Sequence, residues 1–157
     1  MEKIKIDNEN IFKKALSYFK NSSDSIEVKK SDSSLKNIQG NIYGLYVDDE
    51  LKYIGERQSD KIASRLNEHL HKCSESTNSK LKEVTEAYNS NKKVSYKTLL
   101  IEPDYQRYAL EVYLIQNIDS LPWNIRDKKR IVSFDTCDDD EMLIAVDKVN
   151  DNKNDNN

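Results

Sequence analysis

Residues 41–55 read NIYGLYVDDELKYIG, and this stretch predicts a β-hairpin. Side chains around Tyr43 alternate between two faces, which is the period of two expected for a strand. The acidic residues 48–50 interrupt the apolar run before Tyr53 resumes it, so two strands joined by a tight turn explain the pattern. Gly55 ends the second strand, where the backbone turns or passes close to another group. A hairpin by itself indicates no chemistry, because tyrosines on strands are most often packing residues.

The segment after the hairpin predicts an amphipathic helix over residues 61 to about 72, with Ser59 or Asp60 as its N-cap. Its buried stripe recurs every four residues, at Ile62, Leu66 and Leu70. Arg65 and His69 are also four apart, so they lie side by side along the border of that stripe, near the core yet able to reach water. Two interpretations are open at this point: both side chains point toward the hairpin, or they decorate the edge of a helix.

Further elements are predicted outside this central pair. Residues 8–20 have the apolar spacing of an amphipathic helix, which packs either on the domain or on a partner. Residues 80–89 predict another helix, and residues 92–101, rich in Val, Tyr, Thr, Leu and Ile, predict a third strand. Residues 105–118 predict a largely buried helix, because apolar side chains surround most of it. The segment 26–30, within a polar linker, is at most one short strand.

Glu111 lies inside that buried helix and is the charged residue that most needs an explanation. Its neighbours on the helix are apolar or aromatic, so an ionised carboxylate there must be paired, hydrogen-bonded or bound to a metal. A functional acid and a structural ion pair with Arg107 or Lys97 are both compatible with the sequence.

The sequence SLPWN, residues 120–124, ends the same helix. Pro122 forbids its continuation, Trp123 is predicted to anchor in the core, and Asn124 follows as a polar residue beside a buried aromatic. Residues 125–130, IRDKKR, place four basic side chains within six positions. Such a cluster is either a solvated strand exit or a contact for phosphate groups.

The length of 157 residues suits one domain with its own core. We divide the chain into an N-terminal helix and polar linker (1–36), a core (37–130) and an acidic C-terminal extension (131–157) whose last residues are predicted to be disordered. The net charge of −3 comes from that extension, which holds eight acidic and two basic side chains. A phosphate-binding surface therefore depends on local clusters of lysine and arginine.

Neither a membrane span nor an export signal is expected. No apolar run approaches the roughly 20 residues that cross a bilayer, and the N-terminal residues lack the apolar middle of a secretory signal. Cys73 and Cys137, without an export signal, favour a reduced, cytoplasmic protein, and neither has the CxxC partner that would indicate zinc.

The order and spacing of five elements resemble the GIY-YIG nuclease superfamily. They are NIY with Tyr43, KYIG with Tyr53 ten residues later, Arg65 and His69 four apart, Glu111 within LEVYLI, and the PWN that ends at Asn124. The resemblance covers about residues 38–130 and is greatest to the small stand-alone phage and restriction endonucleases of that family. It implies a bacterial or phage-encoded protein with an α/β (α+β) fold, in which a small three-stranded antiparallel sheet is flanked by helices.

By this resemblance the chain is a magnesium-dependent DNA endonuclease that hydrolyses phosphodiester bonds in double-stranded DNA, in restriction or in phage or mobile-element biology. Tyr43 and Tyr53 flank the catalytic pocket, Arg65 contacts the phosphate, and His69 assists proton transfer or positions the nucleophile. Tyrosine has a free pKa near 10. Tyr43 therefore takes a proton from water only if a nearby cation or His69 lowers that value or relays the proton.

The same resemblance implies the metal and DNA contacts. Glu111 binds one divalent cation, Mg²⁺ or Mn²⁺, together with substrate phosphate oxygens, which suits a hard cation that prefers oxygen ligands. Asn124 orders the pocket. The residues expected to bind DNA are basic side chains: Arg57, Lys61, Lys128, Lys129 and Arg130.

The sequence departs from the family pattern at two positions. Asn41 replaces the glycine of the first motif; the rival motif GLY at residues 44–46 is rejected, because it leaves only seven residues to Tyr53. Glu56 stands where the family often has a lysine, with Arg57 as the obvious substitute cation.

A third departure is that no separate DNA-recognition domain is visible. The chain would then read DNA through insertions, its N-terminal segment or a second subunit of a homo-oligomer. Glu56 also supports an alternative function, a catalytically impaired nucleic-acid-binding or regulatory module on the same fold. A fold retained for protein interaction alone is a third reading.

Overall fold

The computed structural model describes residues 8–71 and 79–124. Four strands form one antiparallel sheet in the order β1-β4-β2-β3. Their bounds are β1 (Ile26–Val28), β2 (Ile42–Val47), β3 (Glu50–Glu56) and β4 (Val94–Leu99). The hairpin and the third strand predicted from the sequence are confirmed, and the short linker strand adds a fourth. The predicted fold class, an antiparallel sheet flanked by helices, is also confirmed.

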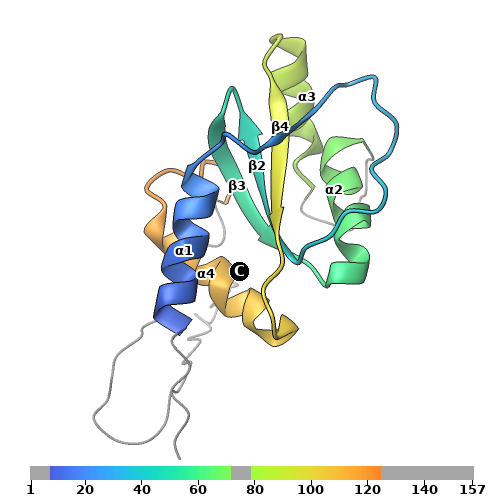
Figure 1. Cartoon of the computed structure of the whole chain (residues 1–157). Coiled ribbons are helices and arrows are strands. Elements are labelled where there is room, and N and C mark those ends of the chain that lie inside the picture. The colour runs from blue at the N-terminus through green and yellow to red at the C-terminus, as the bar shows by residue number, and fades with distance from the viewer. Residues whose placement is uncertain (1–7, 72–78, 125–157) are drawn as a thin grey trace, which may run out of the picture.

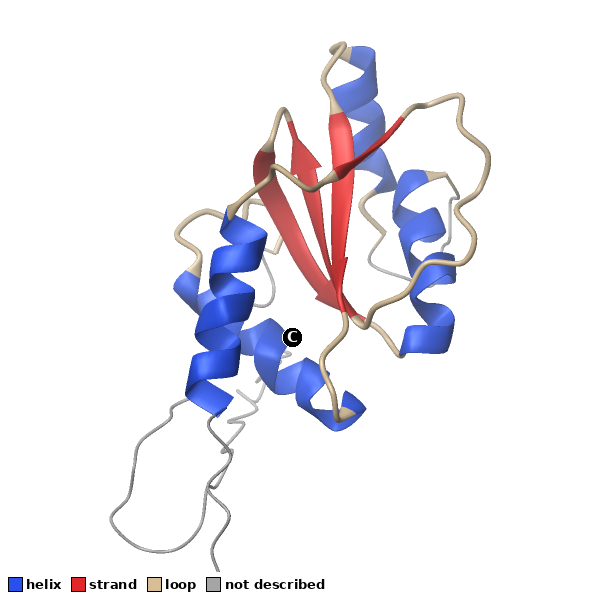
Figure 2. Cartoon of the chain, viewed as in Figure 1, coloured by secondary structure: helices blue, strands red, loops and turns tan. Residues whose placement is uncertain are grey.

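Helices cover both faces of the sheet, as Figures 1 and 2 show. The α-helices are α1 (Asn8–Lys20), α2 (Ile62–Leu70), α3 (Leu81–Asn89) and α4 (Arg107–Asn117), and short 3-10 turns precede two of them, at η1 (Ser59–Lys61) and η2 (Asp104–Gln106). Helices α1 and α4 lie on one face, and α2 and α3 lie on the other. Among the helices in residues 8–71 and 79–124, none is both long and apolar enough to span a bilayer.

The β2–β3 hairpin has the register that its sequence pattern requires. Tyr43 pairs with Gly55, and Leu45 pairs with Tyr53, before a bulge shifts the register. The turn residues Asp48 and Asp49 have φ values of 50° and 66°. Aspartate tolerates this left-handed conformation, and two such residues in succession match the twist of hairpin strands.

The alternation along the strands divides the apolar residues between two clusters. On the α1/α4 face the core includes Phe12, Phe19, Ile42, Ile54 and Leu114. On the α2/α3 face it includes Tyr43, Leu45, Tyr53, Leu66 and Val84. Helix α1 therefore packs on the sheet of this chain, which settles the choice between the domain and a partner for residues 8–20.

Several sequence predictions meet a different outcome or fall outside the described residues. The predicted N-cap at Ser59 or Asp60 is wrong, because the turn η1 precedes α2 and Lys61 occupies the cap position without a side-chain hydrogen bond. Predictions for Cys73, for residues 125–130 and for the extension 131–157 lie outside the part of the chain that the structure describes.

Candidate active site

Three aromatic rings meet on the α2/α3 face of the sheet. Tyr43 comes from β2, Tyr53 from β3 and His69 from α2. The ring centroids lie 6.0 Å apart for the two tyrosines, 5.6 Å apart for Tyr43 and His69, and 5.3 Å apart for Tyr53 and His69. All three side chains are buried, with at most 7% exposed. The structure thus brings together three of the residues that the motifs singled out.

Gly55 makes room for the Tyr43 ring. A Cβ atom at Gly55 would lie 2.4 Å from the Tyr43 hydroxyl oxygen and 2.8 Å from a ring carbon of Tyr53. Any larger residue would therefore displace the hydroxyl, which gives a physical reason for the glycine that ends the YIG sequence.

The two ring nitrogens of His69 have different partners. Nε2 lies 2.9 Å from the Tyr43 hydroxyl, and the main-chain N–H of Lys80 donates to Nδ1 across 2.9 Å. Burial lowers the pKa of His69 to about 3, with help from the positive charges of Arg65 and Lys80. His69 is therefore neutral at neutral pH.

Arg65 on α2 interacts both with Tyr43 and with Glu68 of its own helix. Its guanidinium is 2.8 Å from the Glu68 carboxylate, and it is close enough to the Tyr43 hydroxyl to interact by charge and hydrogen bonding. Burial alone would lower the pKa of Arg65, but Tyr43, Glu68 and Tyr53 together raise it. Arg65 thus brings a permanent positive charge to the tyrosines.

The Tyr43 hydroxyl is held in its protonated form by its surroundings. Burial raises its pKa well above the usual 10, and the neighbouring Tyr53 and Glu111 raise it as well. Arg65 acts in the opposite direction. Additional positive charge at this place would favour the phenolate.

Glu111 is buried in α4, with 9% of its surface exposed. Its charge reaches the Tyr43 hydroxyl. The sequence allowed an ion pair of Glu111 with Lys97 or Arg107. Lys97 donates to the main-chain oxygens of Tyr18 and Asn21, at 2.8 and 2.7 Å. Arg107 forms ion pairs with Glu56 and Asp104.

The Glu56 side chain faces α4 and not the rings of Tyr43, Tyr53 and His69. Its carboxylate lies 2.6 Å from Arg107 Nε, and Arg107 also pairs with Asp104. Gly55 lies against Tyr43 and Tyr53. Because successive residues of a strand point to opposite faces, the Glu56 side chain points away from them. The Glu56 carboxylate is thus paired with a cation on the face of β3 opposite the two tyrosines.

A metal ion would find few protein ligands here. In residues 8–71 and 79–124 no group of three or more His, Cys, Asp and Glu side chains could hold one. One buried carboxylate, that of Glu111, is chemically suited to Mg²⁺, which commonly binds one or two carboxylates and fills its other positions with water and phosphate oxygens. The donor set fits a hard divalent cation shared with a substrate.

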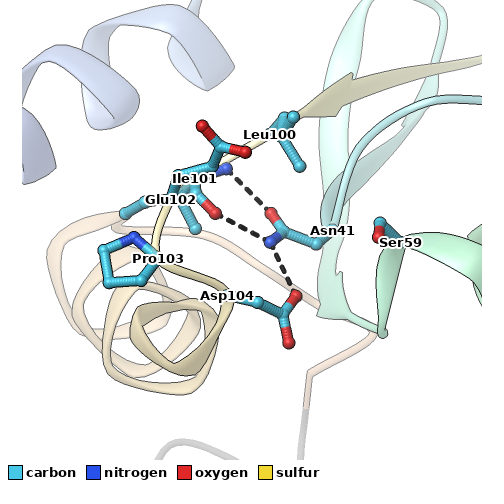
Figure 3. Close-up of a pocket in the computed structure, with 7 residues that line it drawn as sticks. All are labelled: Asn41, Ser59, Leu100, Ile101, Glu102, Pro103 and Asp104. Carbon is cyan, nitrogen blue, oxygen red and sulfur yellow. Dashed lines mark hydrogen bonds between the residues drawn. The ribbon is translucent and has the colours of Figure 1, made fainter.

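Asn41, in place of the motif glycine, is fully buried and joins β2 to the segment after β4. Its amide accepts from Ile101 N–H at 2.9 Å and donates to Ile101 O at 2.9 Å and to Asp104 Oδ1 at 3.0 Å (Figure 3). The open depression in Figure 3, lined also by Ser59 and Pro103, contains none of the residues with predicted catalytic roles. The departure at Asn41 is structural.

Tyr46, the tyrosine of the rival GLY register, lies away from Tyr53 and His69. It points to the α1/α4 face, where its hydroxyl donates to Phe19 O at 2.7 Å. Only Tyr43, from the chosen register, lies beside Tyr53 and His69.

Asn124 and its neighbour close the free edge of β3. Asn124 accepts from Ile54 N–H at 2.9 Å and donates to Ile54 O at 2.8 Å, and Trp123 N–H donates to Lys52 O at 3.1 Å. Asn124 thereby fixes the backbone between the second tyrosine and Gly55. It supports the site through the main chain of the strand.

Of the predicted DNA contacts, Arg57 and Lys61 are exposed at the end of β3 and in η1. Lys128, Lys129 and Arg130 lie outside the described residues. The sequence analysis missed Lys80. Its ammonium lies 5.4 Å from the centre of the Tyr53 ring, and in the described part of the chain no carboxylate forms a salt bridge with it.

No family model matches the chain, and no curated protein matches it. Among solved structures, a mutant of EndoII from bacteriophage T4 is similar, with 18% sequence identity and a TM-score of 0.48 over 72% of this chain and 98% of that chain.

Proposed function

We propose that this chain is a metal-dependent endonuclease that hydrolyses phosphodiester bonds in double-stranded DNA, with Mg²⁺ or Mn²⁺ as its cofactor. The observation that carries the proposal is the contact of 2.9 Å between the Tyr43 hydroxyl and His69 Nε2, beside the charge of Arg65. His69 and Arg65, both on α2, converge on the hydroxyl group of Tyr43 on β2. Packing alone requires no such convergence of polar atoms.

Hydrolysis of a phosphodiester requires a base for the attacking water and positive charge for the pentacovalent phosphate. Tyr43 is the proposed base. Because its pKa is raised in the unliganded site, it needs added positive charge before it can accept a proton. Arg65 supplies part of that charge and also faces the phosphate.

Glu111 is the proposed ligand for the divalent cation. A bound Mg²⁺ would polarise the phosphodiester and stabilise the leaving oxygen. The buried position of Glu111 favours this role, because a cation beside the carboxylate offsets the cost of its burial.

Lys80 joins Arg65 as a cation for the substrate phosphate. Its ammonium lies 5.4 Å from the centre of the Tyr53 ring without a salt bridge among the described residues, whereas Arg65 and Arg107 are both paired with acids. We place Arg57 and Lys61, together with Lys128, Lys129 and Arg130, in the wider DNA contact. We also propose that a homo-oligomer of this chain recognises the DNA site, with a second subunit adding contacts.

Incubation of purified protein with supercoiled plasmid and Mg²⁺ or Mn²⁺ tests the function. The wild type is expected to nick or linearise the plasmid. Glu111→Gln keeps the size of the side chain and is expected to be slower by at least about 100-fold. Glu86→Gln, on the exposed side of α3, is the matched control and keeps full activity.

The outcomes separate the competing functions. Cleavage that requires Glu111 supports the nuclease. Salt-dependent DNA binding without cleavage would instead support the nucleic-acid-binding module. Absence of both binding and cleavage would overturn the two proposals together. Sequencing of the product ends then distinguishes a defined restriction site from scattered cuts.

A further inference from the structure

The main chain of Lys80 approaches His69 from the side opposite Tyr43. Its N–H donates to Nδ1 at 2.9 Å, while Nε2 lies 2.9 Å from the Tyr43 hydroxyl. A main-chain N–H can only donate, so Nδ1 must carry a lone pair. In a neutral imidazole one nitrogen accepts and the other donates. The proton of His69 is therefore on Nε2, which faces Tyr43.

We propose that Lys80 is a positioning residue, whose main-chain N–H selects the Nε2–H tautomer of His69 and so makes His69 a hydrogen-bond donor to the Tyr43 oxygen. This inference rests on the proposed function for its importance in catalysis. It narrows the role of His69, because an Nε2 that already holds a proton cannot receive one from Tyr43. His69 positions and stabilises the tyrosine oxygen, and a proton relay through His69 is excluded.

The donor role suits a tyrosine that must become negative. A phenolate at Tyr43 gains a hydrogen bond from His69 Nε2–H and the charge of Arg65. The opposite tautomer would accept the Tyr43 proton in a hydrogen bond and favour the neutral phenol. The low pKa of His69 agrees with this geometry, because an imidazolium would place a second N–H against the Lys80 N–H.

Neighbouring hydrogen bonds hold Lys80 in place. Ser79 Oγ donates to Glu68 O, at 2.6 Å, on the helix that carries His69, and Leu81 N–H donates to Ser79 Oγ at 3.2 Å. The start of α3 is thus fastened to α2 directly beside the imidazole. Since His69 is fully buried, water does not compete for Nδ1.

Nitrogen-15 NMR of the imidazole tests the tautomer directly. Long-range proton–nitrogen spectra distinguish a protonated ring nitrogen from a bare one, and loss of signals in His69→Gln assigns them. At about pH 7 the wild type is expected to show Nε2 protonated and Nδ1 bare. A protonated Nδ1 in the wild type would overturn the proposal, and this measurement requires neither substrate nor metal.

Two substitutions at Lys80 separate its main chain from its charge. Lys80→Met removes the ammonium and keeps the N–H, so the wild-type tautomer is expected. Lys80→Pro removes the ammonium and the N–H together, at the N-cap of α3, where proline is tolerated better than inside a helix. The Nδ1–H form is expected to appear in Lys80→Pro alone, and an unchanged tautomer in a folded Lys80→Pro would overturn the assignment.

Cleavage rates connect the tautomer to catalysis. Lys80→Pro is expected to cleave plasmid about tenfold more slowly than Lys80→Met, which has lost the same charge. Equal rates would show that the tautomer has no part in the reaction. If the wild type cleaves no DNA, the proposed function is wrong. The NMR measurement still tests the tautomer of His69, because it does not depend on cleavage.

Discussion

Replacing Gly55 with alanine tests how closely the hairpin positions its tyrosine. The new methyl carbon would lie 2.4 Å from the Tyr43 oxygen and 2.5 Å from the ring carbon that bears it. Carbon atoms in contact lie about 3.5 Å apart, so the Tyr43 hydroxyl must move by roughly 1 Å. That displacement breaks its 2.9 Å contact with His69. A misplacement of this size costs about 100-fold in rate.

The stability cost of the same change should be moderate. Overpacking of a core costs about 1–3 kcal/mol, which urea unfolding can measure. Gly44→Ala is the matched control, because its methyl group would lie 2.9 Å from Leu51 Cδ1 and 3.1 Å from Phe19 on the opposite face. It is expected to lose comparable stability and to keep its cleavage rate.

Plasmid cleavage at saturating metal and protein compares the two glycine variants. The expected result is a loss of about 100-fold in Gly55→Ala alone. If Gly55→Ala cleaved at the wild-type rate, or if Gly44→Ala lost as much activity, the close approach of Tyr43 to Gly55 would have no catalytic meaning.

Three further predictions follow from buried or charged groups. The pKa of His69 is about 3 in the folded chain, below its ordinary value of 6.5. Between these two values the unfolded chain binds a proton that the folded chain does not. The free energy of unfolding therefore falls as pH drops from 6.5 toward 3. Between pH 6.5 and 5 this loss is about 2 kcal/mol in urea unfolding, and His69→Gln should lack that part of the pH dependence; an equal slope in both proteins would contradict it. Asn124→Ala leaves the Ile54 N–H and C=O without their partner and is expected to lower the free energy of unfolding by about 2–4 kcal/mol. A loss below about 0.5 kcal/mol, which is typical of an exposed site, would show that the edge of β3 does not depend on Asn124. Lys80→Met should weaken DNA binding and reduce the slope of log affinity against log salt by about 1; an unchanged slope would remove Lys80 from the phosphate contact.

Local periodicity was sufficient to predict the centre of the fold. The alternation around Tyr43 and its resumption at Tyr53 predicted a hairpin, which the pairing of Tyr43 with Gly55 and of Leu45 with Tyr53 confirms. The four-residue spacing of Arg65 and His69 placed them side by side at the border of the buried stripe but left open whether they face the hairpin. In the structure both approach Tyr43. Such patterns are readable because a strand and a helix repeat with fixed periods.

Contacts between distant segments were not predictable in the same way. The link of Lys80 N–H to His69 Nδ1 depends on where the chain returns after residues 72–78, and a main-chain donor leaves no signal in the identity of its residue. The pairing of Glu56 with Arg107 joins residues 51 positions apart. Strand alternation could have indicated that Glu56 and Gly55 face opposite sides, but not which cation would meet the carboxylate.

Asn41 shows the same limit for a substitution within a motif. Its sequence position indicated only a missing glycine, whereas the structure gives its amide three hydrogen bonds to residues 101–104. The short polar side chain of Asn41 makes a fixed connection between β2 and the segment that leads to α4. Its importance is visible only once both segments are placed in space.

The cleavage of supercoiled plasmid by Tyr43→Phe tests the central claim most directly. This change removes one oxygen atom, the one that faces His69 Nε2, and leaves the buried ring in place. The account predicts that the wild type cleaves in Mg²⁺ or Mn²⁺, whereas a folded Tyr43→Phe binds the DNA and cleaves at least about 100-fold more slowly. Cleavage by Tyr43→Phe at the wild-type rate would contradict it.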